Sequence, residues 1–253
     1  MKEQIHTIPI SDAMENAGEC PFCYIERRTE NHTMDFVLGH GASYMEADIR
    51  EMTDKEGFCR NHFKKMFDYG NALGNAWILK THYMRILEEM DKEFKNFKPT
   101  KAKKSGLFKK DTESTNSISS WIKQKEASCF ICSSVDKTFQ AYMKTFFTMY
   151  KKDASFREQV ANTKGFCLSH FSVLCDAADT YLNEKELQDF YQVVLPLMKN
   201  NTERVFEDVS WFVEKFDYKN KDADWKNSKD AIQRGMQKIK GGDPSLPPHV
   251  LKK

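Results

Sequence analysis

The chain has 253 residues, of which 40% are hydrophobic and 30% are charged, so it can bury a substantial core and is not disordered throughout. Its formal net charge of +2 excludes a polycation built to coat nucleic acid. No run of about 18 apolar residues occurs, so we expect no membrane span.

The first twenty residues are mixed and polar and do not resemble a signal peptide. We therefore expect a soluble cytoplasmic protein, because thiols stay reduced in the cytoplasm and clustered cysteines there more often bind metal than pair as disulfides. The chain has seven cysteines, and a complete set of disulfides would leave one of them unpaired.

The first motif in chain order is a C-x-x-C pair, Cys20-Pro21-Phe22-Cys23. Proline suits the first position of a helix, where its missing N–H costs nothing, so we expect a helix to begin at Pro21. The pair recurs 109 residues later as Cys129-Phe130-Ile131-Cys132.

The second motif is G-F-C-x-x-H-F, which spans Gly57–Phe63 and recurs 108 residues later over Gly165–Phe171. Five identities at nearly the offset of the C-x-x-C pair are hard to obtain by chance, so we interpret the chain as an internal duplication. Only Cys175 falls outside the motifs, and we expect it to be a small buried apolar residue.

Apolar residues recur at helical spacing over most of the chain, whereas alternating strand patterns are essentially absent. The clearest stretches are Phe63–Phe97, Val135–Tyr150 and Leu187–Phe216, the last with a possible kink at Pro196. The sequence predicts an all-α fold. Each repeat should contain a helix after C-x-x-C, a short connecting helix, and a longer helix opened by C-x-x-H.

Composition divides the chain into four parts. We expect a first metal-binding helical repeat over residues 1–98, a Lys/Ser-rich linker over 99–120, a second metal-binding repeat over 121–217, and a tail over 218–253. Residues 92–110 hold eight lysines and one glutamate. These lysines could contact phosphate, but a solvated flexible connector is the favoured interpretation.

The tail should contain a short helix from about Lys229 to Lys240, with Ser228 as its N-cap. Its apolar stripe consists of Ile232, Met236 and Ile239. We expect this stripe to strap the two halves of the chain together, and docking to a partner is the alternative.

The motif residues are suited to holding a metal ion. Residues i and i+3 of a helix share a face, so a cysteine and a histidine spaced C-x-x-H can converge on one ion, which a C-x-x-C pair grips from the other side. Together they form a closed Cys₃His tetrahedron, a common structural zinc set. We expect two zinc ions, one per repeat, with these ligands: Cys20, Cys23, Cys59 and His62; Cys129, Cys132, Cys167 and His170.

Which pairs meet is a separate question. We favour ligands from within one repeat, because an autonomous unit is what a duplication copies, and an exchange of pairs between the copies is the alternative. Redox chemistry of a C-P-x-C dithiol and an iron–sulfur cluster with Cys₃His ligation also remain open.

The other histidines have no counterpart in the second copy, and we do not expect them to be ligands. His40 lies in a glycine-flanked segment that could line a pocket, although a break between helices is favoured. No residue is singled out as catalytic. The five histidines outside the motifs are His6, His32, His40, His82 and His249.

The paired C-P-x-C and G-F-C-x-x-H-F motifs resemble an uncharacterised bacterial family of cysteine-rich helical proteins, a domain of unknown function. The resemblance covers most of the chain and, more loosely, the tail around Phe216–Lys229. The second copy departs from C-P-x-C, with Phe130 where the first has proline. The resemblance implies a cytosolic, metal-binding helical protein and no particular activity.

The function we expect is a zinc-stabilised helical scaffold that binds another macromolecule, with protein favoured over nucleic acid. The closed ligand set argues for a structural role and against an enzyme. The alternatives are an iron–sulfur or thiol redox protein or enzyme, and a nucleic-acid-binding protein that uses the lysines of the linker.

Overall fold

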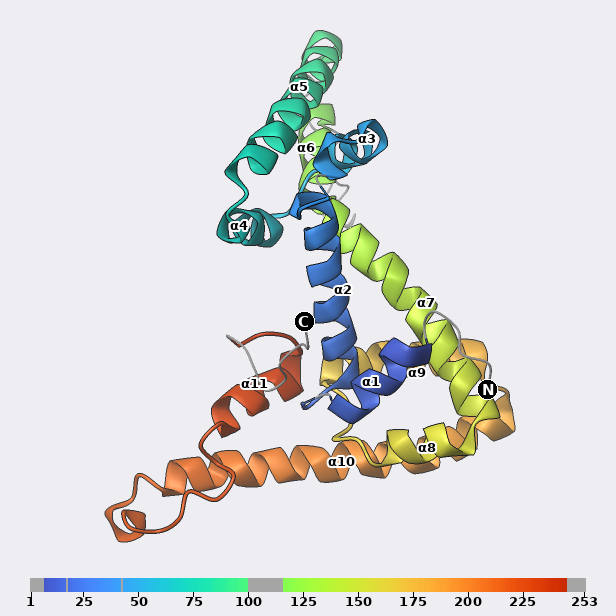
Figure 1. Cartoon of the computed structure of the whole chain (residues 1–253), viewed down its shortest axis with the longest axis vertical. Helices are drawn as coiled ribbons and strands as arrows, with labels where there is room; N and C mark the ends of the chain where they lie inside the picture. Colours follow the sequence, from blue (N-terminus) through green and yellow to red (C-terminus); the bar gives the residue numbers. More distant parts are fainter. Residues whose placement is uncertain (1–6, 17, 42, 100–115, 245–253) are drawn as a thin grey trace, which may run out of the picture. The chain divides into compact units, whose positions relative to one another are not determined.

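A computed structural model describes residues 7–16, 18–41, 43–99 and 116–244, and this part of the chain is helical without any strand (Figure 1). The all-α fold expected from the sequence is thereby confirmed. None of the described helices is long and apolar enough to cross a membrane.

The chain forms two compact units, of which the second is one continuous segment inserted between the two segments of the first. Unit 1 comprises residues 1–29 and 137–253, and unit 2 comprises residues 30–136. Two long helices, α2 (Pro21–Leu38) and α7 (Phe130–Lys152), each belong partly to both units. The helix predicted at Pro21 therefore begins there, with proline as its first residue.

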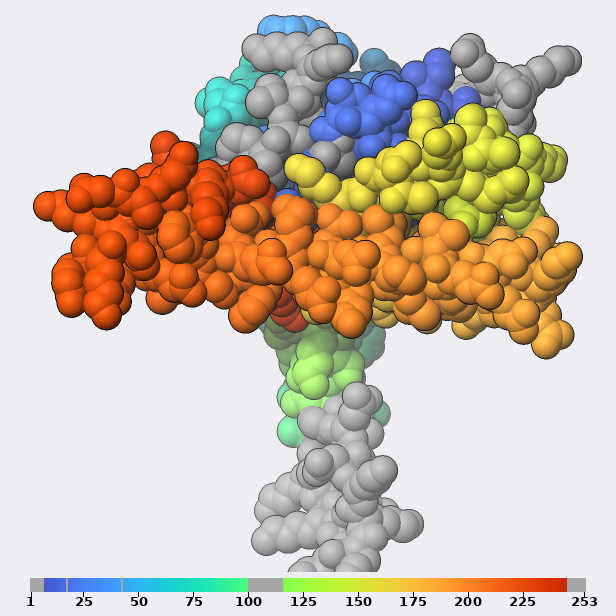
Figure 2. Space-filling view, turned by 90° about the horizontal axis from the view of Figure 1, so that it is seen from below, coloured from blue at the N-terminus to red at the C-terminus, as the bar shows by residue number. Residues whose placement is uncertain are grey.

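Unit 1 contains the start of α2, most of α7, and six further elements. Helix α10 runs along one face of this unit and packs against α8 and α11, while α9 also contacts α11 (Figures 1 and 2). The six elements are α1 (Thr7–Asn16), α8 (Ala154–Ala161), α9 (Leu168–Tyr181), α10 (Glu184–Glu214), the 3₁₀ helix η2 (Tyr218–Asn220) and α11 (Ala231–Lys240).

Unit 2 contains the remainder of α2, the start of α7, and five further elements. Helix α5 is its longest complete helix and packs against α3, α4 and α6. The five elements are the 3₁₀ helix η1 (Ser43–Met45), α3 (Ala47–Glu56), α4 (Arg60–Tyr69), α5 (Ala72–Asn96) and α6 (Ser117–Ala127).

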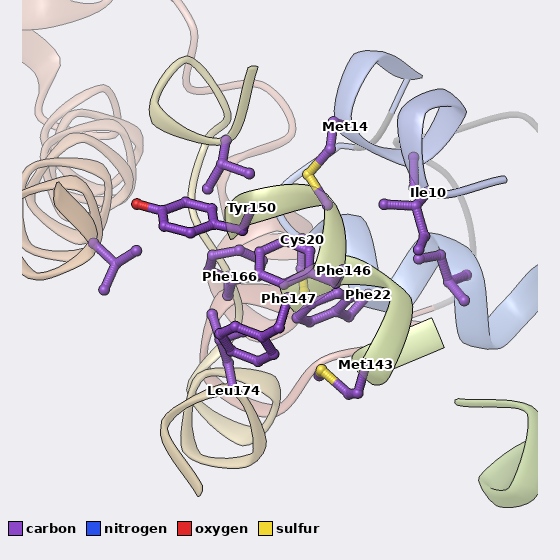
Figure 3. Close-up of a cluster of buried hydrophobic side chains, with 14 of the residues drawn as sticks. Ile10, Met14, Cys20, Phe22, Met143, Phe146, Phe147, Tyr150, Phe166 and Leu174 are labelled. Carbon is purple, nitrogen blue, oxygen red and sulfur yellow. The ribbon is translucent and has the colours of Figure 1, made fainter. Parts of the chain in front are cut away.

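The core of unit 1 is rich in aromatic side chains (Figure 3). Phe22, the residue before Cys23, lies at its centre: its ring centroid is 5.5 Å from that of Phe146 and 5.0 Å from that of Phe166. Edge-to-face and offset ring pairs of this kind are favourable beyond the area they bury. Packing of Phe22 in the core therefore positions the C-x-x-C segment, in addition to any metal ion that its cysteines bind.

Unit 2 has a smaller core, built in a related way. Phe58 and Phe130 are buried, with ring centroids 6.5 Å apart, and Ile131 is fully buried. The backbone N–H of Phe130 donates to the carbonyl of Gly57 at 2.9 Å, which joins the two motifs directly. Gly57 has a φ of 64°, and a Cβ there would lie 2.8 Å from the His82 ring, so glycine is required.

The predicted helix over Phe63–Phe97 is in fact two helices. The chain turns at Gly70, which has a φ of 83°, and the side chain of Asn71 caps α5 by accepting from the Gly74 N–H. Glycine in the left-handed conformation ends helices readily, so the break has a local cause. In contrast, α10 continues through Pro196.

The linker expected over residues 99–120 lies mostly outside the described residues, since 100–115 are not described. Helix α6 begins at Ser117, within the final residues assigned to the linker. His40 is exposed at the turn after α2, as the favoured interpretation of a helix break requires.

The tail helix differs from its prediction in two respects. It begins at Ala231 after Asp230, and Ser228 instead donates its hydroxyl to the carbonyl of Trp225 at 2.7 Å. The apolar stripe expected to pack inward is exposed, by 45% at Ile232 and 53% at Met236. The polar face of the helix packs inward instead, with Arg234 and Lys238 buried.

We predict that the two cores depend on their aromatic residues. Phe146→Ala should destabilise unit 1 by about 3–5 kcal/mol, because it leaves a cavity among rings that cannot close around it. Phe206→Ala is the matched control, since that ring is 68% exposed, whereas Phe146 is fully buried. Urea unfolding followed by circular dichroism measures both. Equal losses would contradict the assignment of the core.

Candidate metal sites

The eight motif cysteines and histidines come together as two groups of four, one in each unit. In each group the four ligand atoms all lie within 4.8 Å of one another. The first site consists of Cys20, Cys23, Cys167 and His170, in unit 1; the second site consists of Cys59, His62, Cys129 and Cys132, in unit 2.

The expectation that each repeat supplies its own four ligands is wrong. Each site joins a C-x-x-C pair to the C-x-x-H pair that is more distant in sequence, Cys20 and Cys23 to Cys167 and His170, and Cys129 and Cys132 to Cys59 and His62. The reason is the length of the helix after each C-x-x-C: the 18 residues of α2 carry the chain about 27 Å away from Cys20 before the next motif begins. The C-x-x-H that approaches Cys20 therefore comes from elsewhere in the chain.

Helix starts position all the ligands. Cys20 and Cys129 directly precede α2 and α7, while Cys59 and Cys167 are the N-cap residues of α4 and α9. Backbone N–H groups at a helix start are free to donate to a thiolate. The N–H of His170 does so to the sulfur of Cys167 at 3.4 Å.

The distances in the first site fit a tetrahedral ion. His170 Nδ1 lies 3.5 Å from Cys20 Sγ, 3.3 Å from Cys23 Sγ and 3.2 Å from Cys167 Sγ. Bonds of about 2.3 Å to sulfur and 2.0 Å to nitrogen would give tetrahedral edges of about 3.5 Å between sulfur and nitrogen and about 3.8 Å between sulfurs. The sulfurs of Cys23 and Cys167 are 3.7 Å apart, too far for a disulfide and close to such an edge.

The second site has nearly the same dimensions. His62 Nδ1 lies 3.2 Å from Cys59 Sγ, 3.2 Å from Cys129 Sγ and 3.4 Å from Cys132 Sγ. The sulfurs of Cys59 and Cys132 are 4.0 Å apart. In both sites the same ring nitrogen, Nδ1, faces the three sulfurs.

The other ring nitrogen of each histidine meets a carboxylate of α2. His62 Nε2 is 2.8 Å from Glu30, and His170 Nε2 is 3.2 Å from Glu26. A carboxylate that accepts the Nε2 proton fixes the tautomer in which Nδ1 is free to bind a metal. These carboxylates complete the arrangement expected of a histidine that binds a metal.

Sequence reasoning missed both glutamates, and an alignment of the two C-x-x-C segments could not have found them. The positions on α7 that correspond to Glu26 and Glu30 are occupied by Val135 and Phe139. Only the structure identifies them, as acidic residues of α2 that lie one and two helical turns after Cys23.

The electrostatics of the second site favour a multivalent cation. Burial lowers the pKa of His62, but hydrogen bonds to Cys129 and Glu30 outweigh it and raise the pKa to about 10. The pKa of Cys129 is lowered to about 6 because the contact with His62 outweighs burial. Burial and the neighbouring Cys129 raise the pKa of Cys132 to about 12. One imidazolium thus supports one thiolate, and three thiolates need more positive charge.

The first site behaves in the same way. Burial opposes the charged form of His170, but contacts with Cys167 and Cys20 raise its pKa to about 12. Contacts with Cys20 and Cys23 lower the pKa of Cys167, while the neighbouring Cys167 and Cys20 raise that of Cys23. Both groups could hold metal ions, and a dication supplies the charge that a proton on the ring does not.

The seventh cysteine takes no part in either site. Cys175 lies on α9, is partly buried, and has a pKa raised by burial. It therefore provides a natural control for experiments on the other six thiols.

Comparisons with known proteins bear on the family only. A family model described as a family of unknown function matches residues 1–245. No curated protein and no solved structure matches the chain.

We predict that the carboxylates on α2 tune metal affinity. Glu30→Gln should weaken metal binding at the second site by about 10–100-fold, because a neutral amide holds the His62 ring less firmly. Glu26→Gln should weaken the first site less, since its contact is longer and its side chain is 43% exposed against 19% for Glu30. Competition with a chromophoric chelator measures both affinities. An unchanged affinity in Glu30→Gln would refute the role of the carboxylate.

Proposed function

Since the chain belongs to a family of unknown function, DUF6062, we propose its role from its own side chains: it is a zinc-stabilised helical scaffold that binds another protein. The observation that carries the proposal is the pair of Cys₃His groups, each assembled from two segments that are distant in sequence.

Zinc is the ion that best suits these groups. It takes four ligands in a tetrahedron, favours thiolate and imidazole, and in structural sites leaves no coordination position open. Three sulfurs and one Nδ1 with edges of 3.2–4.0 Å match that preference. A closed set of four protein ligands supports a structural role for the ion and leaves no position for a substrate.

Each zinc would act as a cross-link within one unit. In unit 1 it would tie the start of α2 to the start of α9, and in unit 2 the start of α4 to the start of α7. Closing such long loops costs conformational entropy, which the binding energy of the ion offsets. Helical units with small cores gain most from such a cross-link, and unit 2 has the smaller core.

The surface of α11 supports a protein partner. Ile232, Met236 and Ile239 project from this helix with 45%, 53% and 57% of their surface exposed. Exposed lysines, Lys229 and Lys240, lie before and after this stripe. An apolar stripe with basic flanks suits a partner that presents an apolar face with acidic flanks.

We predict that loss of one ligand removes one zinc and unfolds the unit that holds it. Cys59→Ser should leave one zinc per chain and abolish the cooperative unfolding of unit 2, because zinc supplies about 10–16 kcal/mol to the folding of small zinc domains. Cys167→Ser should do the same to unit 1. Elemental analysis and amide hydrogen exchange, resolved by unit, measure these outcomes.

The matched control for these variants is Cys175→Ser, which should keep two zinc ions and lose no more than about 0.5 kcal/mol of stability. If Cys59→Ser leaves metal content and stability unchanged, the scaffold proposal is wrong. A brown protein that contains iron and sulfide in place of zinc would favour the alternative of an iron–sulfur or redox protein.

We predict that α11 provides the partner contact. Met236→Glu should weaken binding of the purified partner at least about tenfold, or ~1.4 kcal/mol, because it places a charge in the apolar stripe. The partner is identified first by capture on the wild-type chain. Leu195→Glu is the control, since Leu195 on α10 is also 53% exposed. Equal losses in both variants would contradict this assignment. A wild-type chain that dimerises through Met236 would show instead that the partner is a second copy.

A further inference from the structure

The two candidate metal sites differ in their access to solvent, although their ligand types are identical. All four side chains of the first site are buried. In the second site His62 and Cys129 are buried, Cys59 is partly exposed, and Cys132 is exposed. A reagent in solution can therefore reach a sulfur of the second site directly.

Backbone from the end of α11 covers the first site. The N–H of Gly242 donates to Cys23 Sγ at 3.3 Å. A Cβ at Gly241 would lie 3.0 Å from Cys167 Sγ and 3.2 Å from Cys23 Sγ, so the peptide lies directly on these two sulfurs. Only glycine allows this approach, because Gly241 also has a φ of 73°.

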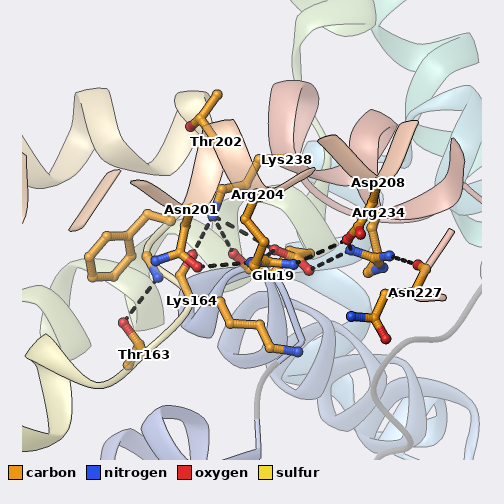
Figure 4. Close-up of polar contacts among 12 residues, drawn as sticks. Glu19, Thr163, Lys164, Asn201, Thr202, Arg204, Asp208, Asn227, Arg234 and Lys238 are labelled. Carbon is orange, nitrogen blue, oxygen red and sulfur yellow. Dashed lines mark hydrogen bonds and ion pairs between the residues drawn. The ribbon is translucent and has the colours of Figure 1, made fainter. Parts of the chain in front are cut away.

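Buried charges hold this cover in place (Figure 4). Lys238 of α11 donates to the carbonyl of Glu19 at 3.2 Å and to the carbonyl of Lys164. Arg234 pairs with Asp208 of α10 at 2.9 Å and lies 3.7 Å from the buried carboxylate of Glu19. Since Glu19 directly precedes Cys20, the network ties α11 to the segment that carries two ligands of the first site.

We propose that the second site is a redox-responsive zinc site, which releases its ion when Cys132 is oxidised, whereas the covered first site keeps its ion. The inference rests on the proposed occupation of both sites by zinc. It follows from the contrast between an exposed sulfur in one site and buried, hydrogen-bonded sulfurs in the other. Oxidation of cysteine depends on thiolate character and on exposure, and bound zinc keeps both sets of sulfurs as thiolates.

The oxidant would be a peroxide. The thiolate of Cys132 attacks one oxygen of hydrogen peroxide, the O–O bond breaks, and a sulfenic acid and a hydroxide form. The thiolate of Cys59, with its sulfur 4.0 Å away, then attacks the sulfenic sulfur, forms the disulfide and expels a second hydroxide. Two protons from solvent convert the hydroxides to water. The two sulfurs lose two electrons to the peroxide, and zinc, left with two ligands, dissociates.

Release of this ion would undo one cross-link of unit 2 and leave unit 1 intact. The start of α4, which carries Cys59 and His62, would lose the zinc that ties it to the start of α7. Peroxide would thus loosen one half of the protein and spare the other. In this proposal, exposure to an oxidant causes a local change in the structure of unit 2.

The test uses the full chain loaded with two zinc ions, in the Cys175→Ser background so that every remaining thiol belongs to a site. Hydrogen peroxide is added, and a chromophoric chelator reports free zinc over time. We expect one zinc per chain to appear at least about tenfold faster than the other, in proportion to the access of the sulfurs. Differential alkylation and peptide mapping should then find a disulfide that includes Cys132, with Cys20, Cys23 and Cys167 unmodified.

Adjacent glycines provide a matched pair of variants. Gly241→Ala places a methyl group against two sulfurs of the first site and should lift the cover, so that the slow zinc is released several-fold faster. Gly242→Ala carries the same kind of backbone strain, with a φ of 51°, but its Cβ would meet nothing within 4 Å, and it keeps the N–H that donates to Cys23. It should leave the slow phase nearly unchanged.

The outcomes separate the two proposals. A protein purified without metal refutes the zinc scaffold before any peroxide is added. Two bound zinc ions that leave at the same rate, or a disulfide confined to the first site, overturn the redox inference and leave the scaffold standing. Retention of both ions at peroxide concentrations that oxidise free cysteine also overturns it.

Discussion

The structure depends on the meeting of a C-x-x-C pair with a C-x-x-H pair from a distant part of the chain. The meeting brings three sulfurs and one imidazole nitrogen within 4.8 Å in each unit. The opposed pKa shifts of Cys129, lowered to about 6, and Cys132, raised to about 12, indicate that the protonated ring supports one thiolate and not three. A dication would allow all three thiols to ionise, and the proposed zinc would thereby form the cross-link that closes each unit.

The residues of both candidate sites could be selected from the sequence, but their pairing could not. A C-x-x-H spacing at a helix start predicts that Cys59 and His62 lie on the same face, because three residues make nearly one helical turn. It carries no information about which C-x-x-C they face. That choice depends on the lengths of α2 and α7, 18 and 23 residues, which carry the chain away from the C-x-x-C pair at the start of each helix. A long helical stretch after each C-x-x-C pair favours a C-x-x-H partner from elsewhere in the chain, but it does not identify that partner.

Helical periodicity misled the interpretation of α11 for a similar reason. The period identifies residues that share a face, and it grouped Ile232, Met236 and Ile239 correctly. It does not determine which face meets the core. Here the neighbouring segment presents Glu19, a carboxylate whose side chain is only 1% exposed, and a buried carboxylate needs cations close by. Arg204 of α10 pairs with it most closely, at 2.5 Å, and Arg234 and Lys238 of α11 lie 3.7 and 3.9 Å away. The charged face of α11 therefore turns inward and the apolar stripe outward.

The inward-facing charged side of α11 also bears on the difference between the two sites, which have identical ligand types. The proposed duplication supplies the ligands in pairs, but α11 belongs to unit 1, and the glycines at its C-terminal end lie against the first site. The hydrogen bond from Gly242 to Cys23 and the close approach of Gly241 to Cys167 place backbone directly on two sulfurs of the first site. Reactivity of a thiolate is set by access as much as by coordination. On the proposed occupation of both sites by zinc, the buried ion would be suited to permanent support and the exposed one to exchange and reaction. A single helix would then be enough to give two sites with the same ligand types different chemistry.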